Sequence, residues 1–341
     1  MSTFSPMPRC IERVVLPLAA ALLLAVAPGC RDGGPAPAPE ARPLTVLYTC
    51  DTQGYIFPCE CEGGNEGGIA RRAHYLGELP AGPRILVDAG DFTAGGRDWE
   101  VLQARFILRG YARMGYHAVN LGHREARLAP EVLASFREEC DRLVSANLVD
   151  AKGEPVVAPY VVVALEDGTR VGIIGVMDDS LPARELGKGL ALLPPDTALG
   201  RYLPELRKKS DVVVLLAFAD EETMLNLANL FYEINVAVGG RVKQSSAKAL
   251  TLNQAVGVAI TDKGKKIGRL ELDVAGGVVR ARTNTVVALT KAVPDEVRAA
   301  AIQKAYEAAL KERAFTPKKT FVDDHEGLSD INARQPAKES K

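Results

Sequence analysis

The chain has 341 residues, of which 47% are hydrophobic, and this is enough to bury the core of one large domain or two modest ones. Its 42 Lys and Arg residues are balanced by 43 Asp and Glu residues, which gives a formal charge of −1 at pH 7. Proteins that bind nucleic acids usually carry a basic excess, so this balance predicts no nucleic-acid partner.

Residues 1–29 predict an export signal. Arg9 and Arg13 precede an apolar run at 14–27, and this run is too short to span a membrane comfortably. The run ends in Ala27-Pro-Gly-Cys30, which resembles a bacterial lipobox, in which the cysteine is lipidated and becomes the mature N-terminus. We therefore expect an exported protein, anchored by lipid at Cys30 to the periplasmic or cell-surface side of a bacterial membrane. The alternative is a plain secretory signal with a chance cysteine.

Residues 30–43 are rich in Pro, Ala and Gly and predict a tether, because this composition cannot bury a core. From 44 to 290, short β-branched runs alternate with amphipathic segments, which is typical of a βαβ architecture. The last strands, from 255 onward, have Gly-rich or charged turns and predict an antiparallel end to this domain. The expected strands are 45–50, 84–88, 117–121, 143–147, 159–165, 170–176, 211–217, 234–238, 255–261, 266–275 and 279–288, and the expected helices are 68–79, 98–114, 129–140, 196–208, 221–232 and 294–314.

The C-terminal part is predicted to hold a helix within 291–316, followed by a polar, disordered tail at 317–341. Arg71 and Arg72, near the start of the helix at 68–79, are expected on a solvated face.

Small or charged residues follow five of the expected strands. Because the carboxyl ends of parallel strands meet at one edge of a sheet, we expect these five loops to face one cleft. The loops contain Asp51, Gly90-Asp91, Gly122-His123-Arg124-Glu125, Ala217-Phe-Ala-Asp220 and Gly239-Gly-Arg241-Val-Lys243.

The order of these loops resembles that of the calcineurin-like metallophosphoesterase superfamily, and specifically its 5′-nucleotidase (UshA-like) branch. The resemblance covers about 44 to 290 and implies a four-layer αββα sandwich of the α/β class. In the family this fold carries a dinuclear metal centre that hydrolyses phosphate esters. The matching segments are 44–54, 67–72, 86–91, 116–125, 145–147, 211–218 and 235–240.

Residue by residue, the resemblance implies a depleted metal site. The family binds two divalent metals through Asp-x-His, Gly-Asp, Gly-Asn-His-Glu/Asp, a later His and Gly-His-x-His. Here Asp51 and Asp91 match the carboxylate ligands, and His123 takes the place of the Asn. The positions of the family's histidines are held by Gln53, Arg124, Phe218, Arg241 and Lys243. Phenylalanine cannot ligate and arginine stays protonated, so we expect at most one residual divalent ion, held by Asp51, Asp91 and His123.

Three of the replaced positions now carry positive charge: Arg124, Arg241 and Lys243. Without metals, Asp51 and Asp91 would lie close together in a partly dry cleft, which is costly unless a cation neutralises them. Guanidinium and ammonium groups in the vacated volume would do so as salt bridges. The pattern leaves two interpretations open, a repacked site without activity and a cationic cleft that binds a small phosphate- or sulfate-like anion.

A Pro-Cys-x-Cys loop with Cys59 and Cys61 follows Asp51. It resembles a cysteine-bearing side branch of the UshA-like proteins, some of which are selenoproteins. Three interpretations remain open. One is a structural disulfide from Cys59 or Cys61 to Cys50 or Cys140. The others are redox or sulfur-transfer chemistry with a partner protein, and soft-metal binding by Cys50, Cys59 and Cys61.

For function, the sequence supports two hypotheses. One is a lipoprotein of this family that lacks dinuclear phosphoesterase activity and acts through its Cys-x-Cys loop or its cationic cleft. The other is an active hydrolase of a phosphate- or sulfur-containing small molecule with an altered metal site. In that case Asp51, Asp91, His123 and Glu125 are the expected catalytic residues.

Overall fold

The computed structural model describes residues 40–59, 65–261 and 263–317. The expected export signal, the lipidation site Cys30, most of the tether, Cys61 and the polar tail lie outside the described residues, and those expectations stay predictions. No helix within the described ranges is long and apolar enough to cross a membrane.

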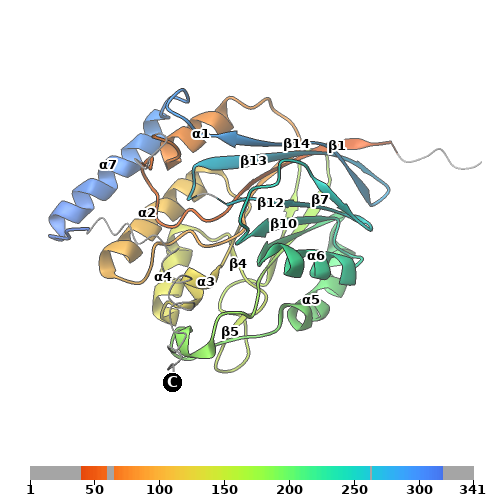
Figure 1. The fold of residues 1–341 in the computed structure, drawn as a ribbon, viewed down its shortest axis with the longest axis horizontal. Helices are drawn as coiled ribbons and strands as arrows, with labels where there is room; N and C mark the ends of the chain where they lie inside the picture. Colours follow the sequence, from red (N-terminus) through yellow and green to blue (C-terminus); the bar gives the residue numbers. More distant parts are fainter. Residues whose placement is uncertain (1–39, 60–64, 262, 318–341) are drawn as a thin grey trace, which may run out of the picture. The chain divides into compact units, whose positions relative to one another are not determined.

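The first sheet has six strands in the order β14-β13-β1-β2-β3-β4 (Figure 1). Strands β1 to β4 run parallel, whereas β13 pairs antiparallel with both β1 and β14. Helices α1, α2, α4 and α7 pack against one another beside this sheet. The bounds are β1 Arg42–Thr49, β2 Arg84–Asp88, β3 Ala118–Asn120, β4 Leu143–Val144, β13 Lys266–Ala275, β14 Val278–Ala288, α1 Ile69–Gly77, α2 Asp98–Met114, α4 Pro130–Glu139 and α7 Val297–Glu312.

The second sheet has the order β11-β12-β10-β9-β7-β6 (Figure 1). Helices α5 and α6 cover the side of this sheet that faces away from the first sheet. Strands β7, β9, β10 and β12 are parallel, and β6 and β11 are antiparallel edges. The bounds are β6 Tyr160–Ala164, β7 Arg170–Met177, β9 Val212–Phe218, β10 Val236–Gly240, β11 Leu250–Leu252, β12 Ala255–Ala259, α5 Pro195–Lys209 and α6 Glu221–Leu230.

Strand β9 shows how the layers are held together. All seven of its residues are buried, which is typical of a central parallel strand that is covered on both faces. Val213, Leu215 and Ala217 pack with α5 and α6, while the alternate residues Val214 and Leu216 pack into the core shared with the first sheet. This alternation confirms the predicted four-layer αββα sandwich.

Two expectations about local structure are wrong. The segment expected at 255–261 is not part of an antiparallel end of the domain, because β12 joins the second sheet parallel to β10. Only β13 and β14 form that antiparallel end. Arg71 and Arg72 are both buried instead of solvated, with 8% and 0% of their surface exposed. The guanidinium of Arg72 donates hydrogen bonds to Tyr111, Tyr116 and Thr52 beneath α1. Five short elements were not expected from the sequence: α3 (His123–Ala126), β5 (Leu148–Asp150), a 3₁₀ helix at Ala183–Glu185, β8 (Leu190–Leu192) and β11 (Leu250–Leu252).

Candidate active-site cleft

The loops after β1 and β2 form one side of the site. The backbone N–H of Asp51 donates to the carbonyl of Gly90 at 2.9 Å, which joins the two loops directly. Asp51 and Asp91 have φ angles of 52° and 58°, and Arg241, across the site, has 53°. Residues other than glycine rarely adopt this left-handed conformation, and such residues cluster at functional sites. These unusual backbone conformations therefore lie at the sheet edge where the strand ends predict a functional site.

Asp51 is buried, with 5% of its surface exposed. Its Oδ2 accepts a hydrogen bond from the hydroxyl of Thr261 at 2.8 Å. Burial raises the pKa of Asp51 to about 6, although the Thr261 hydrogen bond acts in the opposite direction. The carboxyl group therefore loses its proton closer to neutral pH than a solvated aspartate does.

Asp91 contacts Arg124 through both carboxylate oxygens. The backbone N–H of Arg124 donates to Oδ1 at 2.8 Å, and the guanidinium Nε lies 3.5 Å from Oδ2. Arg124 also donates from Nη1 to the carbonyl of Ala94 at 2.8 Å. Burial, and then the negative charges of Glu125 and Asp51, raise the pKa of Asp91 well above its usual range. The positive charge of Arg124 acts in the opposite direction and partly offsets these negative charges.

Glu125 is fully buried and binds backbone groups instead of facing the cleft. Its Oε2 accepts from the N–H groups of Asp91 at 3.0 Å and Gly122 at 2.8 Å, and its Oε1 accepts from Thr93 at 2.8 Å. Burial raises the pKa of Glu125 to about 7, against the effect of these donors. Glu125 fixes the loop after β2 to the loop that begins α3, so its role is to position Asp91.

Asp178 links His123 to Arg241 on the other side of the site. His123 Nε2 lies 3.2 Å from Oδ1 of Asp178, and the His123 ring packs edge-on against Phe218 with the centroids 5.2 Å apart. Nη2 of Arg241 lies 2.8 Å from Oδ2 of Asp178 and 3.5 Å from Asp220. Burial opposes ionisation of Asp178, but hydrogen bonds from His123 and Ser180 and the charge of Arg241 hold its pKa below the usual range.

The five loops predicted from the strand ends thus come together, but the expected cations are not all where the sequence placed them. Arg124 reaches Asp91 as expected. Arg241 pairs with Asp178 and Asp220 instead, and no ion pair joins it to Asp51 or Asp91 within the described residues. Lys243 is exposed, and no ion pair joins it to a carboxylate in the described part of the chain.

No protein-family model matches the chain. A 5′-nucleotidase of Vibrio cholerae is 27% identical over 185 residues, which cover 51% of this chain and 33% of that protein. A 5′-nucleotidase of Vibrio vulnificus is 25% identical over 287 residues, which cover 70% of this chain and 50% of that protein. The chain thus spans a third to a half of the length of these curated relatives.

Solved structures agree with these relatives. A 5′-nucleotidase precursor of Thermus thermophilus superposes with a TM-score of 0.68 at 27% identity, over 79% of this chain and 59% of that one. The calcineurin-like phosphoesterase YfkN of Bacillus subtilis superposes with a TM-score of 0.67 at 18% identity, over 81% of this chain and all of that one. These likenesses in sequence and fold support the metallophosphoesterase/5′-nucleotidase superfamily for this chain.

The dinuclear centre of this superfamily does not fit the residues of the cleft. The described residues contain no group of three or more His, Cys, Asp or Glu side chains arranged to hold a metal ion. Asp91 has Arg124 at both oxygens, and His123 is turned toward Asp178. The residual ion expected at Asp51, Asp91 and His123 therefore lacks an assembled ligand set.

Asp178 contributes to the cleft but was not predicted as a site residue from the sequence. It directly follows β7, so the rule that selected the other loops applies to it as well. The segment Met177-Asp178-Asp179 has the same form as the other strand ends, an apolar run followed by carboxylates. Thr261, which holds Asp51, follows β12 in the same way.

The cysteines are arranged differently from the expected bridge. Cys50 and Cys140 are free and buried, whereas Cys59 is disulfide-bonded, so neither of the two is its partner. The predicted bridge from Cys59 to Cys50 or Cys140 is therefore wrong. The Cys50 thiol donates to the Gly90 carbonyl, with sulfur and oxygen 3.3 Å apart, and burial raises its pKa well above the usual range. A sulfur engaged in a disulfide is no thiolate ligand, so the soft-metal site also lacks Cys59 in this state. Cys61 lies outside the described residues.

Proposed function

We propose that this protein is a non-hydrolytic member of the metallophosphoesterase/5′-nucleotidase superfamily, exported and anchored through Cys30. Its cleft is stabilised by ion pairs in place of a dinuclear metal centre, and its role is to bind a ligand or a partner. The observation that carries this proposal is the contact of Arg124 with both oxygens of Asp91.

The charges around Asp91 support this reading. A divalent ion binds through carboxylate oxygens, and here one oxygen of Asp91 accepts from an N–H group while a guanidinium, whose positive charge repels a metal ion, lies 3.5 Å from the other. On the opposite side, Arg241 lies against Asp178 and Phe218 packs on His123. These contacts would have to break before the site could hold two metal ions, so they favour a site that works without metal ions.

The same contacts favour charge neutralisation over capture of a free anion. Arg124 and Arg241 each already contact a carboxylate, so an incoming phosphate or sulfate would have to displace an internal partner. Of the three cations expected at the cleft, Lys243 is exposed and is the one without a carboxylate partner among the described residues. Thiol exchange at Cys59 also has less support, because only 3% of this residue is exposed to an attacking thiol.

Metal analysis combined with turnover tests the proposal. The purified full-length chain is dialysed against manganese, its bound metal is measured by mass spectrometry, and it is assayed with bis(p-nitrophenyl) phosphate and 5′-AMP. We expect well under one bound metal per chain and no turnover above the buffer rate. Two tightly held metals per chain would overturn the proposal.

An active hydrolase with an altered metal site is the second candidate, because Asp51 and Asp91 are retained and buried close together. Turnover that needs manganese and disappears in Asp91→Asn would establish it. Glu138→Gln is the control variant, since the Glu138 side chain is 72% exposed on α4 and pairs with Arg105 instead of a cleft residue.

A further inference from the structure

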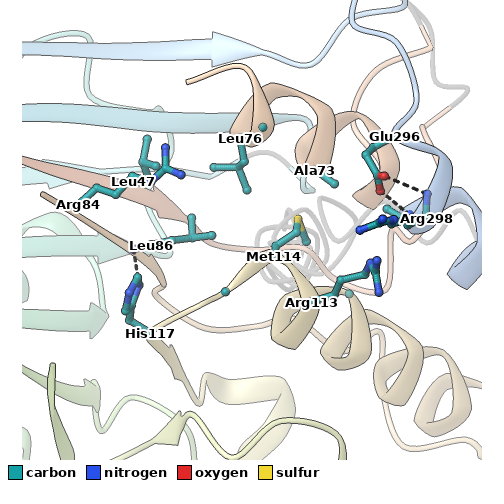
Figure 2. A pocket seen from close by; sticks show the side chains of 14 residues that line it. Leu47, Ala73, Leu76, Arg84, Leu86, Arg113, Met114, His117, Glu296 and Arg298 are labelled. Atoms are coloured by element: carbon teal, nitrogen blue, oxygen red, sulfur yellow. Dashed lines mark hydrogen bonds between the residues drawn. The ribbon is translucent and has the colours of Figure 1, made fainter. Parts of the chain in front are cut away.

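A cavity separate from the cleft lies beside the first sheet, between α1, α2 and the start of α7 (Figure 2). Its volume is about 770 Å³, and none of its lining residues belongs to the cleft. This is within the range of about 300 to 1,000 Å³ that is typical of small-molecule sites.

The inner wall of the cavity is apolar. Leu47 on β1 and Leu86 on β2 are paired in register and both are buried, so they form a continuous apolar surface on the sheet. Leu76 from α1 and Met114 from α2 extend this surface (Figure 2). The space exists because small residues line the two helices where they face each other, namely Ala73, Gly77, Gly110 and Gly115.

The rim of the cavity is cationic. Arg84, Arg113 and Arg298 line it, and Glu296 is the acidic residue beside them, which leaves three positive charges against one negative. Glu296 is already engaged, because it caps α7 by accepting from the N–H groups of Arg298 at 3.0 Å and Ala299 at 2.7 Å. Within the described ranges, no side-chain ion pair joins the three guanidinium groups to a carboxylate.

His117, also on the rim, is neutral. The backbone N–H of Leu86 donates to its Nδ1 at 3.0 Å, so the ring carries its proton on Nε2. Burial, together with nearby arginines, lowers the pKa of His117. The ring therefore adds a hydrogen-bond donor to the rim without adding a charge.

We propose that this cavity binds a single-chain amphiphile with an anionic head group. The alkyl chain lies on Leu47, Leu76 and Leu86, and the head group lies between Arg113 and Arg298, whose two charges Glu296 offsets only in part. A purely apolar ligand would leave the guanidinium groups unused, and a bare anion would leave the apolar wall in water.

Binding of defined probes to the full-length chain tests this proposal. Dodecanoate and dodecyl phosphate, below their micellar concentrations, are titrated by calorimetry beside dodecanol and inorganic phosphate. We expect both amphiphiles to bind, with dodecanol and inorganic phosphate at least about tenfold weaker. Shortening the carboxylate by one methylene should weaken binding about fourfold. The preferred head group identifies the source as a fatty acid or a phosphate-bearing lipid.

Three variants locate the site. Arg113→Gln and Arg298→Gln should each weaken dodecanoate binding about fivefold, since both side chains are exposed and their contacts partly screened. Ala73→Phe should abolish binding by filling the space over Leu86, with its fold checked by circular dichroism. Arg280→Gln on β14, another exposed arginine of the same sheet, is the control and should change nothing.

Three results would overturn the proposal. The first is equal affinity for dodecanol and dodecanoate, and the second is unchanged binding in both arginine variants. The third is binding that appears only after residues 318–341 are deleted, which would assign the cavity to the chain's own C-terminal segment.

Discussion

Two groups of charged side chains lie near the carboxyl ends of the first-sheet strands, and they are neutralised in different ways. In the first, here called the tyrosine cluster, Arg72 donates to the hydroxyls of Tyr111 at 3.0 Å and Tyr116 at 3.1 Å, and Tyr111 donates to Asp88 at 3.0 Å. In the cleft, carboxylates contact arginines directly, and the side chains of Arg124 and Arg241 stay 25% and 36% exposed.

This difference predicts that losing a charged partner costs less free energy in the cleft than in the tyrosine cluster. Every charge of the tyrosine cluster is buried, so the loss of one partner leaves the other without water. In the cleft, water reaches Arg124 and Arg241 and stabilises whatever charge remains. We therefore expect substitutions of charged residues at the cleft to leave the fold intact while the buried layer beneath it is unchanged.

The largest expected effect is in the tyrosine cluster. Arg72→Met should lower the free energy of unfolding by about 3–5 kcal/mol, because it leaves Asp88 buried without a cation. Urea unfolding followed by circular dichroism measures it. The control Arg280→Met removes an exposed arginine and should cost about 0.5 kcal/mol or less. A cost below about 1 kcal/mol for Arg72→Met would show that the tyrosine hydroxyls alone satisfy Asp88.

Glu125→Gln should come next, at about 2 kcal/mol. The amide places an NH₂ group against backbone N–H donors that now bind a carboxyl oxygen, so one buried donor loses its acceptor. The same unfolding measurement applies. Glu138→Gln, with 72% of its side chain exposed, is the matched control and should stay near the wild type. If Glu125→Gln left the free energy of unfolding unchanged, the loops after β2 and β3 would hold their positions without this carboxyl.

The pH dependence of stability tests the cleft directly. Asp51 and Glu125 have pKa values raised to about 6 and 7, above the values of about 4 in an unfolded chain. The folded state therefore holds more protons between about pH 4 and 7, and the free energy of unfolding should fall as pH rises through this window. Asp51→Asn should make the total loss of unfolding free energy across this pH window smaller, by on the order of 1 kcal/mol. Stability that rises from about pH 5 to 7 and is unaffected by Asp51→Asn would contradict the burial of that carboxyl as the cause.

The sequence predicted the fold well because its layers follow from local patterns. Runs such as 212–217 are apolar throughout and short, and the polar residues after them fall at the ends of parallel strands. The cleft was predicted less well, because pairing of its charges depends on distances across two sheets. Arg241 could not be assigned to Asp178 from spacing alone. Burial of Arg72 was missed for a similar reason, since Tyr111 and Tyr116, which receive its hydrogen bonds, are far away in sequence.

The smallest expected effects compare Arg241 with Lys243 at the cleft rim. Arg241→Ala should lower the free energy of unfolding by about 1 kcal/mol, because Asp178 then depends on His123 and Ser180 alone. Lys243→Ala should cost close to nothing, since this side chain is exposed and contacts no described carboxylate. Because Arg241 holds the pKa of Asp178 down, the cost should be present near neutral pH and fade as pH falls below about 4 and Asp178 becomes protonated. Added phosphate tests whether Arg241 serves to neutralise Asp178 or to bind a free anion. If it neutralises Asp178, phosphate should raise the urea midpoint of unfolding equally in the wild type and in Arg241→Ala. A rise confined to the wild type would instead place a bound anion at Arg241.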